Sequence, residues 1–190
     1  MDKPTRIRVL YDEARIAARV EAMAGEIMAG ERAVDRREDL PVVAILKGSF
    51  MFAADLIRAL HRAGLEPHVE FMQLSSYRTG TVSSGQVTIM KDVDSDVRGR
   101  DVLLVDDILE SGRTLAFAKD LLTARGAARV RACVLLEKPG KRAVQITADH
   151  AGFQCPDLFV VGYGMDVAHA YRQLPYVGVI LTSAQNELEV

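Results

Sequence analysis

Apolar side chains recur every three to four residues in three stretches of this chain, 12–29, 49–63 and 115–122. That spacing places them on one face of a helix, so each stretch is predicted to be a helix with one buried side. Ser49 is the first residue of the second stretch and Gly64 follows it. We expect the hydroxyl to cap the start of this helix and the glycine to end it.

Short runs rich in apolar residues lie between these stretches. Some are nearly continuous and others alternate, and both patterns are typical of strands. The predicted strands are 41–46, 69–74, 86–91, 102–105, 129–136, 158–166 and 176–181. Because strands alternate with helices, we expect an α/β fold with a mostly parallel sheet flanked by helices.

Charged residues stand at the predicted carboxyl ends of several of these strands. Ligands of open α/β sheets bind outside that edge. Taken singly, such a residue is more often a surface charge than a ligand contact. Their common position predicts one site, formed by Lys47, Asp106, Asp107, Lys138 and Asp166.

The stretch 75–85 is polar and rich in Gly and Ser, so it has little apolar surface to bury. We expect a mobile loop there, which is either a passive linker or a lid over a site.

The composition narrows the functional classes. A chain of 190 residues with 49% hydrophobic residues is predicted to form a single domain over 1–190. The net charge of −2 argues against a nucleic-acid binder. No apolar run is long enough for a membrane span or signal peptide, and two cysteines without metal spacing suit a reducing interior. We therefore expect a cytoplasmic protein without a membrane partner.

The most informative segment follows the apolar run 102–105. Two carboxylates, Asp106 and Asp107, come first, and the small hydroxyl-bearing turn Ser111, Gly112 and Thr114 comes next. Backbone N–H groups and hydroxyls at the start of a helix favour an anion such as phosphate, and carboxylates accept hydrogen bonds from vicinal hydroxyls. The residues alone fit a sugar-phosphate site and an ordinary strand-to-helix turn equally well.

This segment resembles the phosphoribosyl-pyrophosphate (PRPP) motif of the type I phosphoribosyltransferases. Further motifs extend the resemblance to the hypoxanthine-guanine phosphoribosyltransferases, over about 12–183. These motifs are 46–48, 76–77, 135–139, 159–166 and 171–172. The resemblance implies a small hood made from terminal segments, and transfer of phosphoribosyl from PRPP to hypoxanthine or guanine.

The resemblance also implies which residues bind PRPP. Lys47 and Gly48 would contact pyrophosphate across a non-proline cis peptide, with Arg172 assisting. Ser76 and Tyr77 would belong to a closing loop. Asp106 and Asp107 would lie near the ribose hydroxyls and metal-bound water. The remainder of the PRPP loop would surround the phosphoribosyl group: Ile108, Leu109, Glu110, Ser111, Gly112, Arg113 and Thr114.

For the purine, the resemblance implies that Lys138 donates to the 6-oxo group, Phe159 stacks on the ring and Val160 offers backbone contacts. Asp166 would lie close to the purine and also hold Mg²⁺. The implied metal residues are Asp166, Asp106 and Asp107, whose hard oxygen ligands suit this ion.

Position 110 departs from the pattern of that family. The family commonly has aspartate facing the purine N7, whereas this chain has Glu110. The carboxylate is retained with a reach longer by about one bond, and a displacement of ~1 Å can cost about 10²-fold in rate. A catalytic role for Glu110 as general base or proton relay is therefore a hypothesis.

Two other functions stay open. The chain could use another base, xanthine above all, although Lys138 favours a 6-oxopurine over adenine because an ammonium only donates hydrogen bonds. It could instead be a non-catalytic regulator of the same fold that senses PRPP or a nucleotide. The resemblance also implies a homodimer or homotetramer, which no stretch of the sequence establishes.

Overall fold

The computed structural model describes residues 6–32, 40–79 and 82–181. Within these ranges the side chains of 31–32, 76–79 and 82–86 are left undescribed. None of the helices in these ranges is long and apolar enough to cross a membrane.

The larger sheet has the strand order β4-β3-β2-β5-β6-β7. Its strands are β2 (Leu40–Leu46), β3 (Pro67–Thr79), β4 (Val82–Lys91), β5 (Asp101–Leu109), β6 (Arg129–Glu137) and β7 (His150–Gln154). Neighbouring strands are parallel except β4, which runs antiparallel to β3 at one edge. The predicted α/β fold with a mostly parallel sheet is confirmed.

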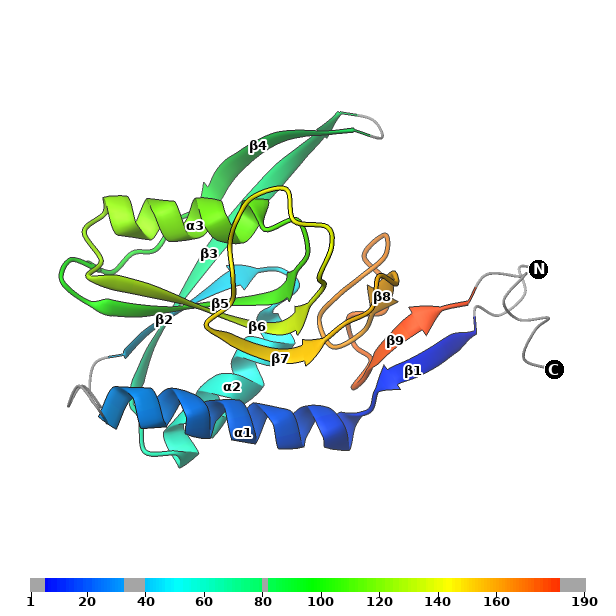
Figure 1. Ribbon diagram of the computed structural model, residues 1–190, viewed down its shortest axis with the longest axis horizontal. Coiled ribbons are helices and arrows are strands. Elements are labelled where there is room, and N and C mark those ends of the chain that lie inside the picture. The colour runs from blue at the N-terminus through cyan, green and yellow to red at the C-terminus, as the bar shows by residue number, and fades with distance from the viewer. Residues whose placement is uncertain (1–5, 33–39, 80–81, 182–190) are drawn as a thin grey trace.

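Helices cover both faces of this sheet (Figure 1). Helices α1 (Glu13–Arg32) and α2 (Phe50–Arg62) lie on one face, and α3 (Arg113–Ala124) lies on the other. Successive residues of β5 alternate between the two sides, since Leu103 packs into the core under α1 and α2 and Leu104 into the core under α3. Burial on both faces explains the continuous apolar run of this strand.

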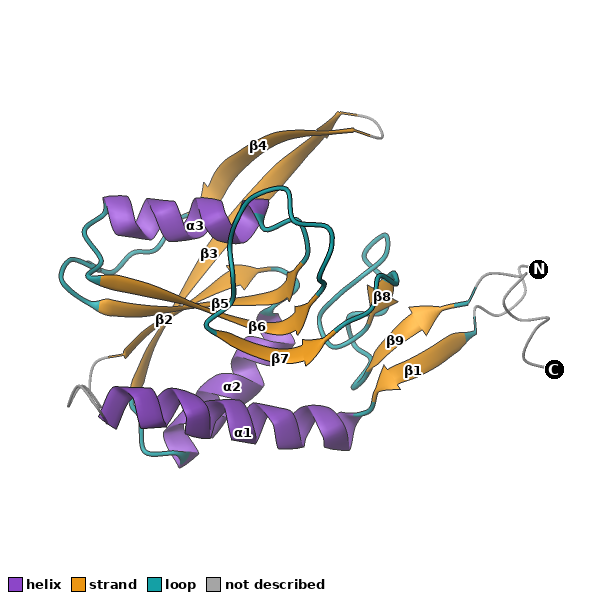
Figure 2. Ribbon diagram, in the orientation of Figure 1, coloured by secondary structure: helices purple, strands orange, loops and turns teal. Residues whose placement is uncertain are grey.

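The smaller sheet joins the two ends of the described chain. It has the order β1-β9-β8, with β1 (Ile7–Tyr11), β9 (Val177–Ile180) and β8 (Val160–Val161), all antiparallel. This sheet lies beyond the carboxyl ends of the larger sheet, where loops gather between the two (Figure 2). The hood expected from terminal segments is confirmed.

The structure differs from the expected strand 158–166. Only Val160–Val161 forms a strand, and the chain then turns sharply through Gly162, Tyr163 and Gly164, all with positive φ. A strand needs negative φ, so the run cannot stay extended through these residues. The two glycines adopt positive φ without steric cost, which allows the turn here.

The stretch 75–85 is paired rather than a loop. β3 continues to Thr79 and β4 begins at Val82, with Ser75 opposite Thr88 and Ser76 opposite Val87. A two-stranded ribbon satisfies its backbone groups by pairing and needs little apolar burial. Residues 80–81 of the predicted loop lie outside the described ranges.

The helix ends agree with the sequence only in part. Gly64 has φ +95° just after α2, as expected of a glycine that ends a helix. Ser49 does not cap the helix, because its hydroxyl donates instead to the carbonyl of Ile45 at 2.5 Å. The expected cap was therefore wrong.

Candidate active site

The central motif forms a strand, a turn and a helix. β5 runs through both acids to Leu109, and α3 begins at Arg113. Gly112 has φ +80°, and a Cβ there would lie 2.5 Å from a methyl carbon of Ile146. Only glycine allows the turn to approach the segment after β6 so closely.

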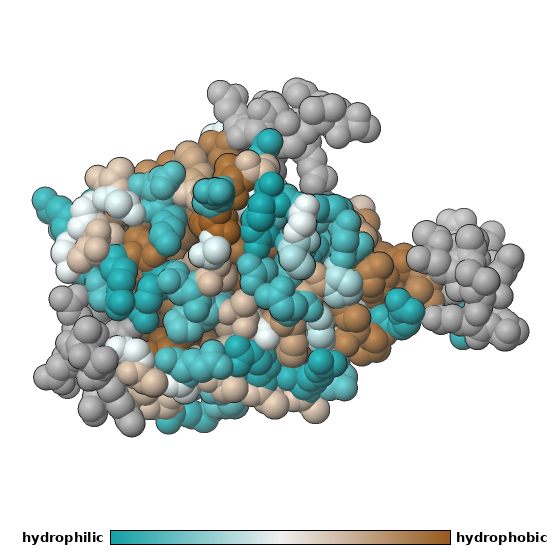
Figure 3. Space-filling view, in the orientation of Figure 1, coloured by the Kyte–Doolittle hydropathy of each residue, from teal (hydrophilic) through white to brown (hydrophobic). Residues whose placement is uncertain are grey.

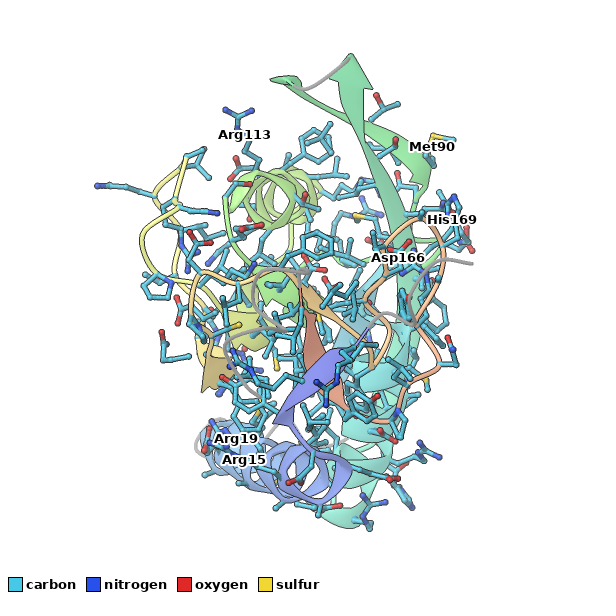
Figure 4. All side chains as sticks on the ribbon, turned by 90° about the vertical axis from the view of Figure 1, so that its right-hand side faces the viewer. Arg15, Arg19, Met90, Arg113, Asp166 and His169 are labelled. Atoms are coloured by element: carbon cyan, nitrogen blue, oxygen red, sulfur yellow. The ribbon has the colours of Figure 1, made fainter. Side chains whose placement is uncertain are left out.

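One cavity of about 540 Å³ opens at this turn, and residues 106–115 line it continuously. Backbone N–H groups at the start of α3 and the hydroxyls of Ser111 and Thr114 are thus available at one end of the cavity. The side chain of Arg113 extends outward from this end of the helix (Figure 4).

A second cavity of about 740 Å³ adjoins the first and shares Gly48, Asp107 and Glu110 with it. The remaining candidate residues with described side chains meet here, at the ends of several strands: Lys47, Lys138, Phe159, Val160, Asp166 and Arg172. Ser76 and Tyr77 lie in β3, and their side chains are outside the described part of the chain.

Three backbone segments approach closely between the cavities. The peptide between Leu46 and Lys47 is cis, as the family resemblance implied. A Cβ on Gly48 would lie 1.8 Å from Oδ2 of Asp107, and a Cβ on Gly164 would lie 2.1 Å from the carbonyl oxygen of Gly48. A side chain at Gly48 would therefore displace the carboxylate of Asp107, and one at Gly164 would push the loop after β8 away from Gly48.

Burial governs the charge of the acid pair. Asp106 is only 7% exposed, and burial together with the negative charge of Asp107 raises its pKa well above the usual value. Burial also raises the pKa of Asp107, while hydrogen bonds and Arg172 oppose that rise. The raised pKa values disfavour full ionisation of the pair, and a bound cation or hydrogen bonds from hydroxyl groups would favour its ionised form.

Lys138 is buried at 5% exposure, and its Nζ donates to Oε1 of Glu110 at 3.3 Å. Lys141 Nζ lies 3.8 Å from the same carboxylate oxygen and 2.6 Å from Asp157. A buried ammonium needs a partner, and Glu110 supplies one while a polar ligand group could share it.

Asp166 is held by its neighbours on the loop after β8 (Figure 4). Its Oδ1 pairs with Arg172 at 2.6 Å and its Oδ2 accepts the backbone N–H of His169 at 2.7 Å. Among the described residues no three His, Cys, Asp or Glu side chains gather closely enough to hold a metal. Because Mg²⁺ commonly uses one or two carboxylates plus phosphate oxygens and water, the donors present fit an ion shared with a ligand.

Phe159 and Val160 present different surfaces to the second cavity. The ring of Phe159 is 61% exposed, whereas Val160 is buried and pairs with Val179 in the smaller sheet. An exposed ring on a cavity wall offers a stacking surface for a flat ligand.

Sequence reasoning missed several residues around these cavities. Lys141, Asp157 and His169 line the second cavity, and Arg142 lies behind it. Lys141 and Arg142 lie a few residues beyond a predicted strand end, and that neighbourhood was the one signal in the sequence that pointed to them.

Comparison with known families agrees with this geometry. A family model described as "Phosphoribosyl transferase domain" matches residues 8–168. The fold and the site at the end of β5 thus define a phosphoribosyltransferase.

Individual relatives narrow the family further. Hypoxanthine phosphoribosyltransferase of Escherichia coli K12 is 42% identical over 175 residues, covering 92% of this chain and 96% of that protein. Hypoxanthine-guanine phosphoribosyltransferase of Bacillus subtilis is 42% identical over 174 residues, covering 91% and 92%. A hypoxanthine phosphoribosyltransferase structure from Trypanosoma cruzi superposes with a TM-score of 0.90 at 33% identity, covering 100% and 98%. The chain belongs to the hypoxanthine-guanine phosphoribosyltransferase family.

The close approach at Gly48 gives a first prediction. Gly48→Ala should weaken binding of PRPP, because the new methyl group must displace the carboxylate of Asp107 by about an ångström. Calorimetric titration with PRPP measures this effect. Gly25→Ala, in α1 with open space around it, is the control and should bind as the unmodified protein does. Equal affinity of both variants would contradict the assignment.

The buried acid pair gives a second prediction. The pKa of Asp106 is raised above its ordinary 3.8, so the native state binds more protons than the unfolded state between these two values. Stability is therefore lost as pH rises through that window. At pH 7, Asp106→Asn should unfold at a higher urea concentration than the unmodified protein. The difference between the two midpoint concentrations should shrink toward pH 4.

Asp120→Asn is the matched control, because Asp120 is exposed on α3. Urea unfolding at several pH values would contradict this prediction if Asp106→Asn were less stable than the unmodified protein at pH 7.

Proposed function

We propose that this protein transfers the 5-phosphoribosyl group from PRPP to hypoxanthine or guanine, giving IMP or GMP and pyrophosphate. The observation that carries the proposal is the pair of adjoining cavities that meet at Asp107 and Glu110. One cavity suits a sugar phosphate and the other has a buried lysine beside an exposed aromatic ring. The protein would thereby act in purine salvage.

The first cavity would bind the ribose 5-phosphate. Hydroxyls of Ser111 and Thr114 and the N–H groups of the turn would donate to the phosphate. Asp106 and Asp107 would accept hydrogen bonds from the ribose hydroxyls. This arrangement fixes the sugar at both ends and directs its anomeric carbon toward the second cavity.

The second cavity would bind the base. Lys138 would donate to the 6-oxo group, Phe159 would stack on the ring, and the backbone of Val160 would contact its far edge. Glu110 would face the ring nitrogen that attacks the anomeric carbon and would accept its proton. Its present partner, Lys138, keeps this carboxylate beside the base.

Pyrophosphate would leave between Lys47–Gly48 and Arg172. The fixed ion pair of Arg172 with Asp166 orients the guanidinium toward the departing charge. Mg²⁺, when bound through Asp166 or the acid pair together with the substrate, supplies further charge neutralisation. Ser76 and Tyr77 on the β3–β4 ribbon would cover the ribose and exclude water, which otherwise hydrolyses an activated sugar.

The decisive experiment offers hypoxanthine, guanine, xanthine, adenine and uracil separately, with PRPP and Mg²⁺, to the purified protein. We expect turnover of hypoxanthine and guanine and none of adenine or uracil. Faster turnover of xanthine would favour the xanthine-preferring alternative. Binding of PRPP without turnover of any base would favour the regulatory alternative.

The role of Glu110 generates a separate prediction. Glu110→Gln should lower kcat by about 10²- to 10⁴-fold and remove the acidic limb of the pH–rate profile, because the amide cannot accept the proton. Glu66→Gln removes an exposed carboxylate from the α2–β3 connection and is the control. Nearly full turnover of Glu110→Gln across the pH range would exclude Glu110 as the base.

We also propose that the chain folds as one domain, acts in the cytoplasm and assembles as a homodimer or homotetramer. Exposed apolar side chains support assembly, with Phe71 on β3 and Met90 on β4 exposed by 40% and 63%. Hydrophobic residues are also visible on the smaller sheet in Figure 3. Free, buried Cys133 and Cys155 suit a reducing compartment. Light scattering at several concentrations measures the assembly state.

A further inference from the structure

The segment that follows β6 runs along both cavities, with Lys138 and Lys141 lining the second cavity and Ala143 lining the first. The backbone N–H of Lys138 donates to the carbonyl of Leu109 at 3.0 Å, and that of Ala143 donates to the carbonyl of Ser111 at 2.9 Å. Ile146 of the same segment contacts Gly112 so closely that no Cβ fits there. This segment therefore sets the position of the loop that carries Glu110 and Ser111.

Arg142 makes the central contact of this segment. One terminal nitrogen, Nη1, lies 2.7 Å from the carbonyl oxygens of both Leu109 and Glu110, and 3.0 Å from that of Lys138. Its two hydrogens are thus shared among three acceptors, two at the end of β5 and one just after β6. Converging carbonyl dipoles repel one another, and a cation between them offsets that repulsion.

The rest of the guanidinium is fixed from other directions. Nη2 forms an ion pair with Glu137 at 2.6 Å, and Nε donates to the carbonyl of Ile146 at 3.3 Å. The second oxygen of Glu137 accepts the side-chain amide of Gln154, in β7, at 2.8 Å. A planar guanidinium presents donors in several fixed directions at once, which a lysine ammonium does not.

These contacts bear on the two residues that would recognise the base. Glu110 and Lys138 belong to separate loops, and their side chains meet at 3.3 Å in the second cavity. Their carbonyl groups meet behind the cavity on one nitrogen of Arg142. Arg142 itself is among the lining residues of neither cavity. The guanidinium therefore controls the spacing of the two backbones without contacting the ligand.

We infer that Arg142 is a positioning residue that holds Glu110 and Lys138 at the separation that the purine base requires. The inference rests on the proposed function, because it assigns the base to the pocket of these two residues. It predicts that loss of the guanidinium impairs use of the base and leaves the phosphate end of the site nearly intact. The Ser111 turn retains its own backbone contact with Ala143.

The test compares Arg142→Met and Arg142→Lys with Arg125→Met. Arg125 also pairs with a carboxylate, that of Asp92, but it lies at the far end of α3 and lines neither cavity. Arg142→Met should lower kcat/KM for hypoxanthine by about 10²-fold, since placement errors of ~1 Å have that effect. Its Kd for PRPP should change less than about threefold. Arg142→Lys should recover part of the loss, and Arg125→Met should keep kcat/KM for both substrates.

Hydrogen exchange gives a readout that does not depend on activity. In Arg142→Met the N–H of Lys138 should exchange faster than in Arg125→Met, because the loops that it joins separate more often. A rise in Kd for PRPP as large as the loss of kcat/KM for hypoxanthine would overturn the inference, as would a loss of kcat/KM no greater than that of Arg125→Met. If the unmodified protein turned over no 6-oxopurine, the proposed function would fail, while faster exchange in Arg142→Met would still support the structural role.

Discussion

The structure depends on two adjacent carboxylates at the end of its central strand, of which Asp106 is buried and Asp107 is partly buried. Such burial is costly unless hydrogen bonds compensate. Oδ1 of Asp106 accepts the N–H of Asp107 at 3.0 Å, and Oδ1 of Asp107 accepts the N–H of Ile108 at 2.9 Å. β5 must therefore stay extended past Val105 as far as the two acids. The adjacent loops must also approach the acids closely, which requires residues without side chains. Gly48 leaves room for the carboxylate of Asp107, and Gly164 leaves room for the carbonyl of Gly48, so close packing beside the acid pair requires glycine on both loops.

The same constraint links the two sheets. The loop after β8 rests on the carbonyl of Gly48 and carries Asp166 and Arg172, which pair with each other above the acids. Tyr163 reaches from this loop to Asp55 of α2 and hydrogen-bonds its carboxylate. Buried residues of the smaller sheet also join the core formed by α1 and α2. The site thus lies where the two sheets and the loop after β8 meet, and no single loop forms it.

Elements with a regular period of buried side chains could be predicted from the sequence, and elements or contacts without such a period could not. The strand β5 and the helices were predictable because burial imposes a regular period on their side chains. β1 and β7 were missed, and the burial pattern of β7 is intermediate almost throughout, so it carries no period. The contacts of Arg142 were beyond sequence reasoning since its partners are mainly backbone carbonyls, which every residue has. The family resemblance supplied roles for the site residues that periodicity could not.

Pairing of β1 with β9 suggests an order in which the two sheets fold. Ile7 lies opposite Ile180, so this pair joins positions separated by almost the whole chain. All strands of the larger sheet precede β9 in the sequence and can associate first, because contacts between distant positions close the longest loop and form late. Val160 lines the second cavity and pairs with β9, whereas no described residue of the smaller sheet lines the cavity at the phosphate turn. The larger sheet and the phosphate turn could therefore form before β9, and pairing of β9 would then complete the wall of the second cavity.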